Sequence, residues 1–171
     1  MHMADALLSP AVGAGFYGVS SATVAWSAWS LRREADSRLV PTMGVLGAFV
    51  FAAQTINFAI PGTGSSGHLA GGMLLAAVLG PSAAFLVMTS VLAVQCFLFA
   101  DGGLLALGAN VFNLAFYPCF LGLPLATALA GRAPSPVRRS LALAAGALVS
   151  VELGALSVAA HHASFEEPRG L

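Results

Sequence analysis

The stretch SAAFLVMTSVLAVQCFLFA, residues 82–100, carries no charged side chain along its whole length. An α-helix rises 1.5 Å per residue, so a bilayer core about 30 Å thick needs about 20 apolar residues. This stretch therefore predicts a transmembrane helix. The whole chain agrees, because 58% of its residues are hydrophobic and only 8% are charged, whereas about 25% of the residues of soluble domains are charged.

Further apolar stretches lie on both sides of this one, at residues 11–31, 40–60, 69–79, 111–130 and 140–160. Together they predict an all-α, polytopic bundle of about six spans that forms a single membrane domain over residues 1–171, with a polar tail at 161–171. Segment 69–79 ends at Gly80-Pro81 and is too short to cross a bilayer alone. We therefore expect residues 61–68 to enter the membrane as a re-entrant loop, and residues 101–110 to form a second re-entrant or lid-like stretch.

Six of the seven arginines lie in two short connections; they are Arg32, Arg33 and Arg38 in one, and Arg132, Arg138 and Arg139 in the other. The positive-inside rule places both connections in the cytoplasm, which puts the N-terminus outside. The predicted location is therefore the plasma or inner membrane of the cell. The formal net charge is zero, so nucleic acid is not an expected partner and the lipid bilayer is. No basic n-region precedes Arg32, so the mature chain is expected to begin at or near Met1.

Residues 1–10 are predicted to be an extracellular metal-chelating segment. The Met1 α-amine, the His2 backbone nitrogen and the His2 Nδ1 can close two fused rings around one metal ion. Such nearly coplanar nitrogens favour Cu(II) or Ni(II), and His68, on the same predicted side, could supply a fourth. The alternative is that a histidine at position 2 is accidental and that His68 is a capping or interfacial residue.

Several polar residues interrupt the apolar stretches, where they usually face the bundle interior. Gln54 and Asn57 lie one turn apart and lead into the 61–68 loop, so together with Ser66 they are candidates for supporting the metal ligands. For Gln95 and Asn113 interhelical hydrogen bonding is the preferred interpretation. The chain contains no nucleotide-binding loop, no His-Glu-xx-His motif and no paired carboxylates. We therefore predict no enzymatic activity and no resident cofactor.

Four segments resemble one family. They read MHMADALLSP at 1–10, FAAQTINF at 51–58, GTGSSGHLAGG at 62–72 and FADGGLLALGANVFN at 99–113. They are similar to the CbiM/NikM group, the substrate-specific components of energy-coupling-factor cobalt and nickel transporters. The version around Asn57-Phe58 and Gly67-His68 looks more like the nickel branch.

The resemblance implies that the Met1 amine, His2 and His68 bind Ni(II) or Co(II) as the transported substrate. It also implies a transmembrane coupling subunit, a pair of cytoplasmic ATPases and a small accessory membrane subunit as partners. The chain departs from the family at Ala6-Leu7, where Gly-Phe is usual. The resemblance also fades after Leu156, where family members generally continue into another helix, so the chain is expected to be one helix short.

Two alternatives remain at this point. One is a cobalt-specific component that serves cobalamin biosynthesis. The other is a structural or assembly membrane subunit that has lost its own transport role.

Overall fold

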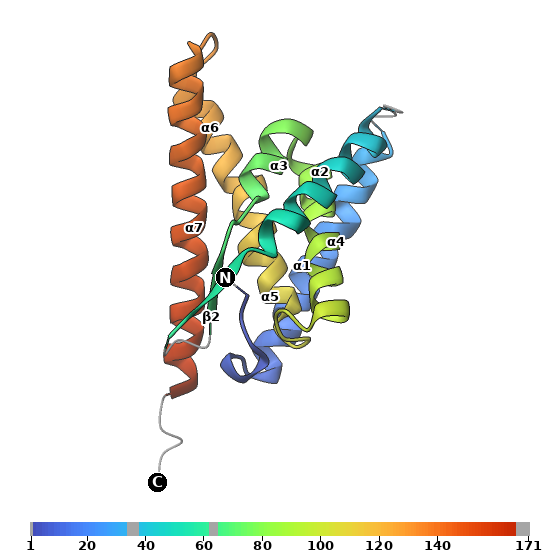
Figure 1. The fold of residues 1–171 in the computed structure, drawn as a ribbon, viewed down its shortest axis with the longest axis vertical. Coiled ribbons are helices and arrows are strands. Elements are labelled where there is room, and N and C mark those ends of the chain that lie inside the picture. The colour runs from blue at the N-terminus through green and yellow to red at the C-terminus, as the bar shows by residue number, and fades with distance from the viewer. Residues whose placement is uncertain (1, 34–37, 62–64, 167–171) are drawn as a thin grey trace.

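The computed structural model describes residues 2–33, 38–61 and 65–166, with the backbone alone at 57, 59–60, 65–66 and 161–166. It is a bundle of helices with one short β-hairpin beside it (Figure 1). In chain order the elements are η1 (Asp5–Leu7), α1 (Pro10–Leu31), α2 (Leu39–Gln54), β1 (Asn57–Ile60), β2 (Ser65–His68), α3 (Gly72–Leu79), α4 (Pro81–Phe99), α5 (Leu107–Val111), η2 (Phe112–Gly122), α6 (Leu123–Ala130) and α7 (Pro136–Glu166).

Local sequence signals set several helix ends. Ser9 caps α1, because its side-chain oxygen accepts a hydrogen bond from the Val12 N–H at 3.4 Å and Pro10 follows at the first helical position. The predicted turn between 69–79 and 82–100 is confirmed at Gly80, whose φ of 78° is accessible to glycine. Pro81 then begins α4.

The helix from Leu107 to Ala130 is continuous but changes geometry, since η2 between α5 and α6 is π-helical. Pro118 lies inside η2 and has no N–H to donate, so the regular α-helical bonding pattern cannot continue through it. α7 packs closely along this helix. A Cβ added at Gly122 would lie 2.9 Å from the Gly146 carbonyl oxygen.

The core lies around α3 and α4, where Leu75, Phe85 and Met88 are fully buried. The outer faces carry exposed large apolar side chains such as Val45, Phe97 and Leu148, as expected for a bundle surrounded by lipid. Three described helices are long and apolar enough to cross a membrane: Pro81–Phe99, Leu107–Ala130 and Pro136–Ala160. The count of six spans remains a prediction.

The end of α1, the start of α2 and the connection between α6 and α7, with six of the arginines in or beside them, lie at one end of the bundle, at the top of Figure 1. The described part of the N-terminal segment and the loop after α4 lie towards the opposite end. Successive connections thus lie at alternate ends of the bundle, as the predicted orientation requires. Which end faces the cytoplasm remains a prediction.

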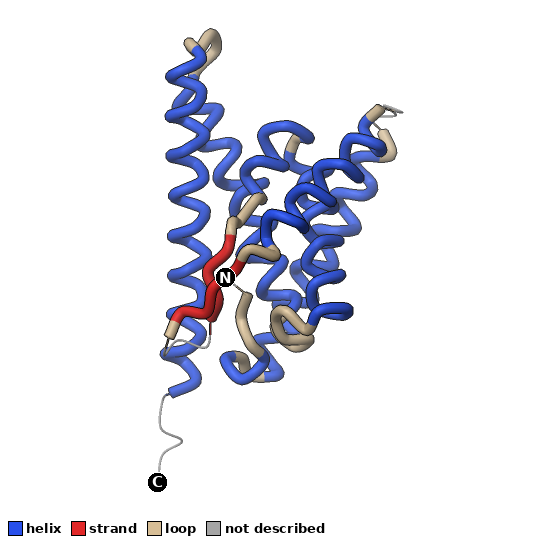
Figure 2. Tube along the Cα trace, viewed as in Figure 1, coloured by secondary structure: helices blue, strands red, loops and turns tan. Residues whose placement is uncertain are grey.

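The predicted helix over 40–60 is too long, because α2 ends at Gln54 and residues 57–60 form β1 (Figure 2). β1 pairs with β2 in antiparallel register, with Asn57 opposite His68 and Phe58 opposite Gly67. Pro61 disfavours helix in the residue before it, and strand pairing satisfies backbone groups that an irregular re-entrant loop would leave open. The chain from 57 to 68 is thus a hairpin, a two-stranded addition to the predicted helical bundle.

Two further boundaries differ from expectation. α7 continues to Glu166, into the segment predicted to be a tail. Within 101–110, α5 already begins at Leu107, and the remaining loop packs on the N-terminal segment rather than forming a separate lid.

Candidate metal centre

The N-terminal segment and the end of the hairpin bring His2 and His68 into contact. Their ring centroids are 4.6 Å apart and the rings are stacked with an interplanar angle of 28°. His2 is only 5% exposed. The structure therefore brings together the two imidazoles that the sequence singled out. The Met1 α-amine, the third predicted donor group, lies outside the described residues.

Hydrogen bonds from the loop after α4 and from α5 fix the backbone next to His2. The Met3 N–H donates to Asn110 Oδ1 at 2.7 Å, and Asn110 Nδ2 donates to the Met3 carbonyl at 3.3 Å. The Gly103 N–H donates to the same carbonyl at 3.0 Å. The Asp5 carboxylate accepts from the Ala106 N–H at 2.9 Å. His2 thus projects from a segment that is bound into the bundle on both sides.

Glycine allows this close approach of two backbones. A Cβ at Gly103 would lie 2.5 Å from the Asp5 backbone nitrogen and would overlap the Asp5 side chain. Gly102 has a φ of 89° and lies over His2 and Asn110. The Gly-Gly pair is therefore required by the position of the N-terminal segment.

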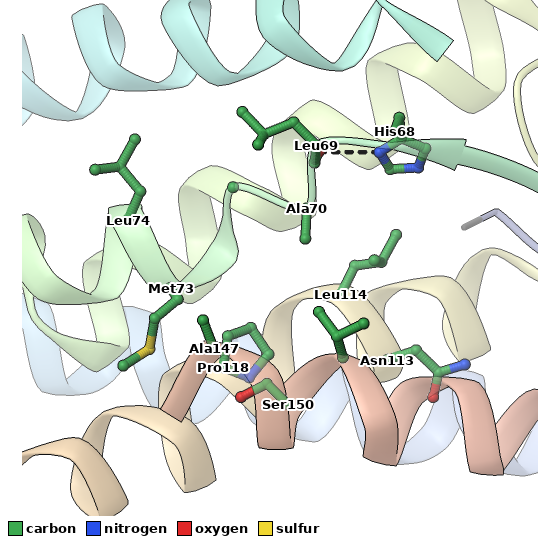
Figure 3. A pocket seen from close by; sticks show the side chains of 12 residues that line it. His68, Leu69, Ala70, Met73, Leu74, Asn113, Leu114, Pro118, Ala147 and Ser150 are labelled. Atoms are coloured by element: carbon green, nitrogen blue, oxygen red, sulfur yellow. Dashed lines mark hydrogen bonds between the residues drawn. The ribbon is translucent and has the colours of Figure 1, made fainter. Parts of the chain in front are cut away.

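His68 is oriented by its own backbone. Its Nδ1 lies 3.0 Å from the carbonyl oxygen of Leu69, the contact drawn as a dashed line in Figure 3. A carbonyl oxygen only accepts, so Nδ1 carries the proton and Nε2 carries the lone pair. Nε2 is buried and has no hydrogen-bond partner among the described residues. This is the usual arrangement of a histidine that binds metal through one nitrogen while the other donates to a carbonyl.

His2 lies beside a carboxylate. Its Nδ1 is 3.0 Å from Asp101 Oδ1, a close contact without hydrogen-bond alignment, and its Nε2 is buried with no partner in the described part of the chain. Burial lowers the pKa of His2 to about 4, although the charge of Asp101 opposes that shift. Burial also lowers the pKa of His68. Both imidazoles are therefore neutral at pH 7, with lone pairs available to a metal ion.

A cavity of about 460 Å³ begins at His68 and extends between α3, η2 and α7 (Figure 3). Its lining is mostly apolar, with Leu69, Met73 and Leu114 among the contributors. Asn113 also lines it, and its buried Oδ1 has no partner among the described residues. Asn113 Nδ2 contacts the Met3 sulfur at 3.8 Å, so this residue joins η2 to the N-terminal segment.

The predicted supporting residues have different outcomes. The printed hydrogen bonds of Gln54 do not go to either described histidine; its Nε2 donates to the carbonyl of Ala70 at 2.7 Å, two residues beyond His68. The side chains of Asn57 and Ser66 are outside those that the structure describes. Gln95 makes the predicted interhelical hydrogen bond, to Gln54. Across the described residues, no group of three His, Cys, Asp or Glu side chains is placed to hold a metal ion.

Sequence reasoning gave no role to Asp101 or Asn110, although both belong to the site's surroundings. The available signals were a lone carboxylate before Gly102-Gly103 on the predicted outer side, and an amide at the start of an apolar stretch. Neither signal identifies a partner. Asn110 bonds to Met3, 107 residues earlier in the chain.

Comparison with known proteins identifies the family of the chain. The sequence model of the family described as "Cobalt uptake substrate-specific transmembrane region" matches residues 2–168. The chain belongs to this family. Its members and the relatives below are metal transport proteins, not enzymes.

Three curated relatives are nickel or cobalt transport proteins. The chain is 43% identical over 122 residues to a putative fused nickel transport protein of Archaeoglobus fulgidus, covering 71% of the chain and 40% of the relative. It is 35% identical over 175 residues to a probable fused nickel transport protein of Lactiplantibacillus plantarum, covering 96% and 52%. It is 32% identical over 124 residues to a cobalt transport protein of Sorangium cellulosum, covering 71% and 55%. The chain thus spans about half the length of these relatives.

The fold also has a solved counterpart. A crystal structure described as a truncated transition metal transporter superimposes with a TM-score of 0.83 at 34% identity, covering 95% of this chain and 74% of the other. The helical bundle predicted from the sequence is therefore shared with a metal transporter of known structure.

Proposed function

We propose that the protein captures Ni(II) between His2 and His68, with Co(II) as the alternative ion, as the substrate-binding membrane component of an ATP-driven energy-coupling-factor transporter. One observation carries the proposal. Two neutral imidazoles are stacked at 4.6 Å, and the two ring nitrogens proposed as donors, the His2 Nδ1 and the His68 Nε2, are buried without a hydrogen-bond partner among the described residues. Burying polar nitrogen without a hydrogen bond costs free energy, and a metal ion would recover that cost.

The proposed donors are the Met1 amine, the His2 backbone nitrogen, the His2 Nδ1 and the His68 Nε2. Asp101 lies at the His2 Nδ1, so a bound metal ion would replace this contact. Imidazole lone pairs lie in the ring plane, and stacked rings direct them side by side rather than at one point. Binding would therefore turn one ring out of the stack.

The donor set favours nickel over cobalt. Four nitrogens near one plane match the square-planar preference of Ni(II). The fused nickel transport proteins among the relatives support this choice, and the cobalt description of the family supports Co(II) as the alternative. Cu(II) binds such donors still more strongly in the general affinity order, so selectivity for nickel would rest on metal supply or on transport.

ATP hydrolysis would come from partner subunits, since this chain contains no nucleotide-binding loop. The proposed partners are a transmembrane coupling subunit, a pair of cytoplasmic ATPases and a small accessory membrane subunit. Co-expression of affinity-tagged protein with such subunits tests this part. Recovery of an assembled complex with metal-stimulated ATPase activity is expected, and its absence from every combination of subunits would contradict the assembly.

Calorimetric titration of the detergent-solubilised protein with Ni(II) tests the site itself. His2→Ala and His68→Ala should each abolish tight binding, whereas His162→Ala, a matched histidine removal in α7, should leave it unchanged. Extending the N-terminus by a few residues blocks the α-amine, and it should also abolish binding and the square-planar absorption band of Ni(II). If both histidine variants bind nickel as well as the parent does, the site is wrong.

A further inference from the structure

We propose that Gln95 and Gln54 form a relay of two buried amides that positions His68 relative to His2. The inference rests on the proposed function, because it concerns the same pair of histidines. The printed side-chain hydrogen bonds of the two glutamines do not reach His2 or His68 within the described residues, so both are positioning residues.

The first link holds the chain just after His68. Gln54 Nε2 donates to the Ala70 carbonyl at 2.7 Å. The preceding carbonyl, that of Leu69, is the one that orients the His68 ring. Side chains therefore contact two successive carbonyls: His68 contacts that of Leu69, and Gln54 of α2 contacts that of Ala70. A shift of the backbone at residues 69–70 would rotate the Leu69 carbonyl and change the orientation of the His68 imidazole.

The same face of α2 restrains the next residue. Gly71 has a φ of 74°, and a Cβ there would lie 2.6 Å from Val50 Cγ1. Val50 lies one helical turn before Gln54, and both side chains are 0% exposed. The segment between β2 and α3 is thus fixed against α2 by one hydrogen bond and one close packing contact.

Gln95 connects this segment to the opposite wall of the site. Its Nε2 donates to Gln54 Oε1 at 2.9 Å. Its backbone carbonyl accepts from the Asp101 N–H at 3.1 Å, where Ala100 ends α4 in a left-handed conformation with a φ of 53°. Asp101 is the residue beside the His2 Nδ1. One residue of α4 therefore contacts the chain on the His2 side through its backbone and on the His68 side through its amide.

The relay requires amide chemistry at position 54. Gln54 must accept from Gln95 and donate to Ala70 at the same time, which a carboxylate or an apolar side chain cannot do. Gln95 is 3% exposed, and its Oε1 has no hydrogen-bond partner among the described residues. An incompletely bonded buried amide is a poor stabilising element, so stability alone does not account for its presence.

The test compares Ni(II) affinity with stability in the full chain. Gln95→Met and Gln54→Met keep approximate side-chain volume and remove the amides. Gln54→Glu keeps an acceptor for Gln95 and, in its ionised form, has no donor for the Ala70 carbonyl. Tyr117→Phe is the matched control, because it removes a different interhelical hydrogen bond, that to Ser157 at 2.7 Å. Metal-free melting temperatures identify variants that are simply unfolded.

Each glutamine variant should bind Ni(II) about 10- to 100-fold more weakly, the range for residues that orient metal ligands, with an altered nickel absorption band. The control should bind as the parent does. The two Met substitutions together should cost no more affinity than Gln54→Met alone, since they interrupt one chain of bonds. Parental affinity in every glutamine variant, or an equal loss in the control, would overturn the relay while leaving nickel capture intact. A parent that binds no nickel would overturn the proposed function first.

Discussion

The two histidines of the site stand on very different supports. His2 lies on a segment that is bound into the bundle: Met3 is 1% exposed, and its backbone is bonded to both Asn110 and Gly103. His68 is the last residue of a hairpin whose two strands pair with each other. The side chain of Phe58 in the first strand is 68% exposed. Among the described residues, Gln54 and Val50 hold the base of the hairpin, at Ala70 and Gly71.

This difference indicates which of the two histidine-bearing segments can move more easily. A segment with few buried apolar contacts opens at lower free energy than one packed in a core. We therefore expect the His2 side to act as the fixed wall and the His68 side to make the adjustment when metal enters.

Gly103→Ala should have the largest effect. The new methyl group would overlap Asp5, including its backbone nitrogen, in a segment that cannot move aside. We expect destabilisation by about 3 kcal/mol or more and loss of measurable nickel binding. Thermal unfolding and calorimetry in detergent check both. Parental nickel affinity in this variant would show that the His2 side is not fixed.

Asn110→Ala should have the next largest effect. It removes the acceptor of the Met3 N–H and a donor to the Met3 carbonyl. A buried N–H without a partner costs about 1–3 kcal/mol, and the segment bearing His2 should lose its fixed position. We expect nickel affinity to fall about 10- to 100-fold. Ser20→Ala, which removes a buried hydrogen bond to Gly108, is the control and should bind nickel normally.

Acid should destabilise the metal-free protein through His2. Its pKa is about 4 when folded and about 6.5 when exposed. The unfolded chain therefore binds the extra proton between these values, so stability is present above pH 6.5 and is lost as the pH falls towards 4. The loss is at most about 3 kcal/mol at 1.36 kcal/mol per pKa unit. Melting temperatures of the parent and of His2→Gln measured from pH 7 to pH 4 should converge in acid, and a parallel decline would contradict this assignment.

Gly67→Ala should have the smallest effect, although its new methyl group also meets atoms at short range. The nearest is Phe58 Cζ at 2.6 Å, but that ring is exposed and can turn away. We expect less than about 1 kcal/mol of destabilisation and a nickel affinity close to that of the parent. An effect as large as that of Gly103→Ala would remove the distinction between the two sides.

The strengths and failures of sequence reasoning follow from the range of the interactions involved. The turn at Gly80-Pro81 was predictable because backbone geometry there is a local property. The helix over 40–60 was predicted too long because a short apolar run suits a strand as well as a helix. The hairpin depends on hydrogen bonding between residues 57–60 and 65–68. Hydropathy does not indicate such pairing.

The site shows the same division. His2 and His68 were predicted to lie on one side because the charge pattern fixes the parity of the spans. Asn110 and Asp101 were not assigned, because their roles depend on the N-terminal segment lying against the loop after α4. Gln95 was correctly predicted to make an interhelical bond, but its link to Ala70 through Gln54 could not be read from spacing.

The sequence by itself determined the class of protein, since a chain with 8% charged residues and long apolar stretches has few stable arrangements outside a bilayer. It also identified the candidate donors, the imidazoles of His2 and His68. Tertiary packing sets how these imidazoles meet, which of their nitrogens lack a hydrogen bond within the described residues, and which buried amides bond near them. These features arise where helices distant in sequence pack together, and contacts of that kind depend on the whole fold rather than on any local run of residues.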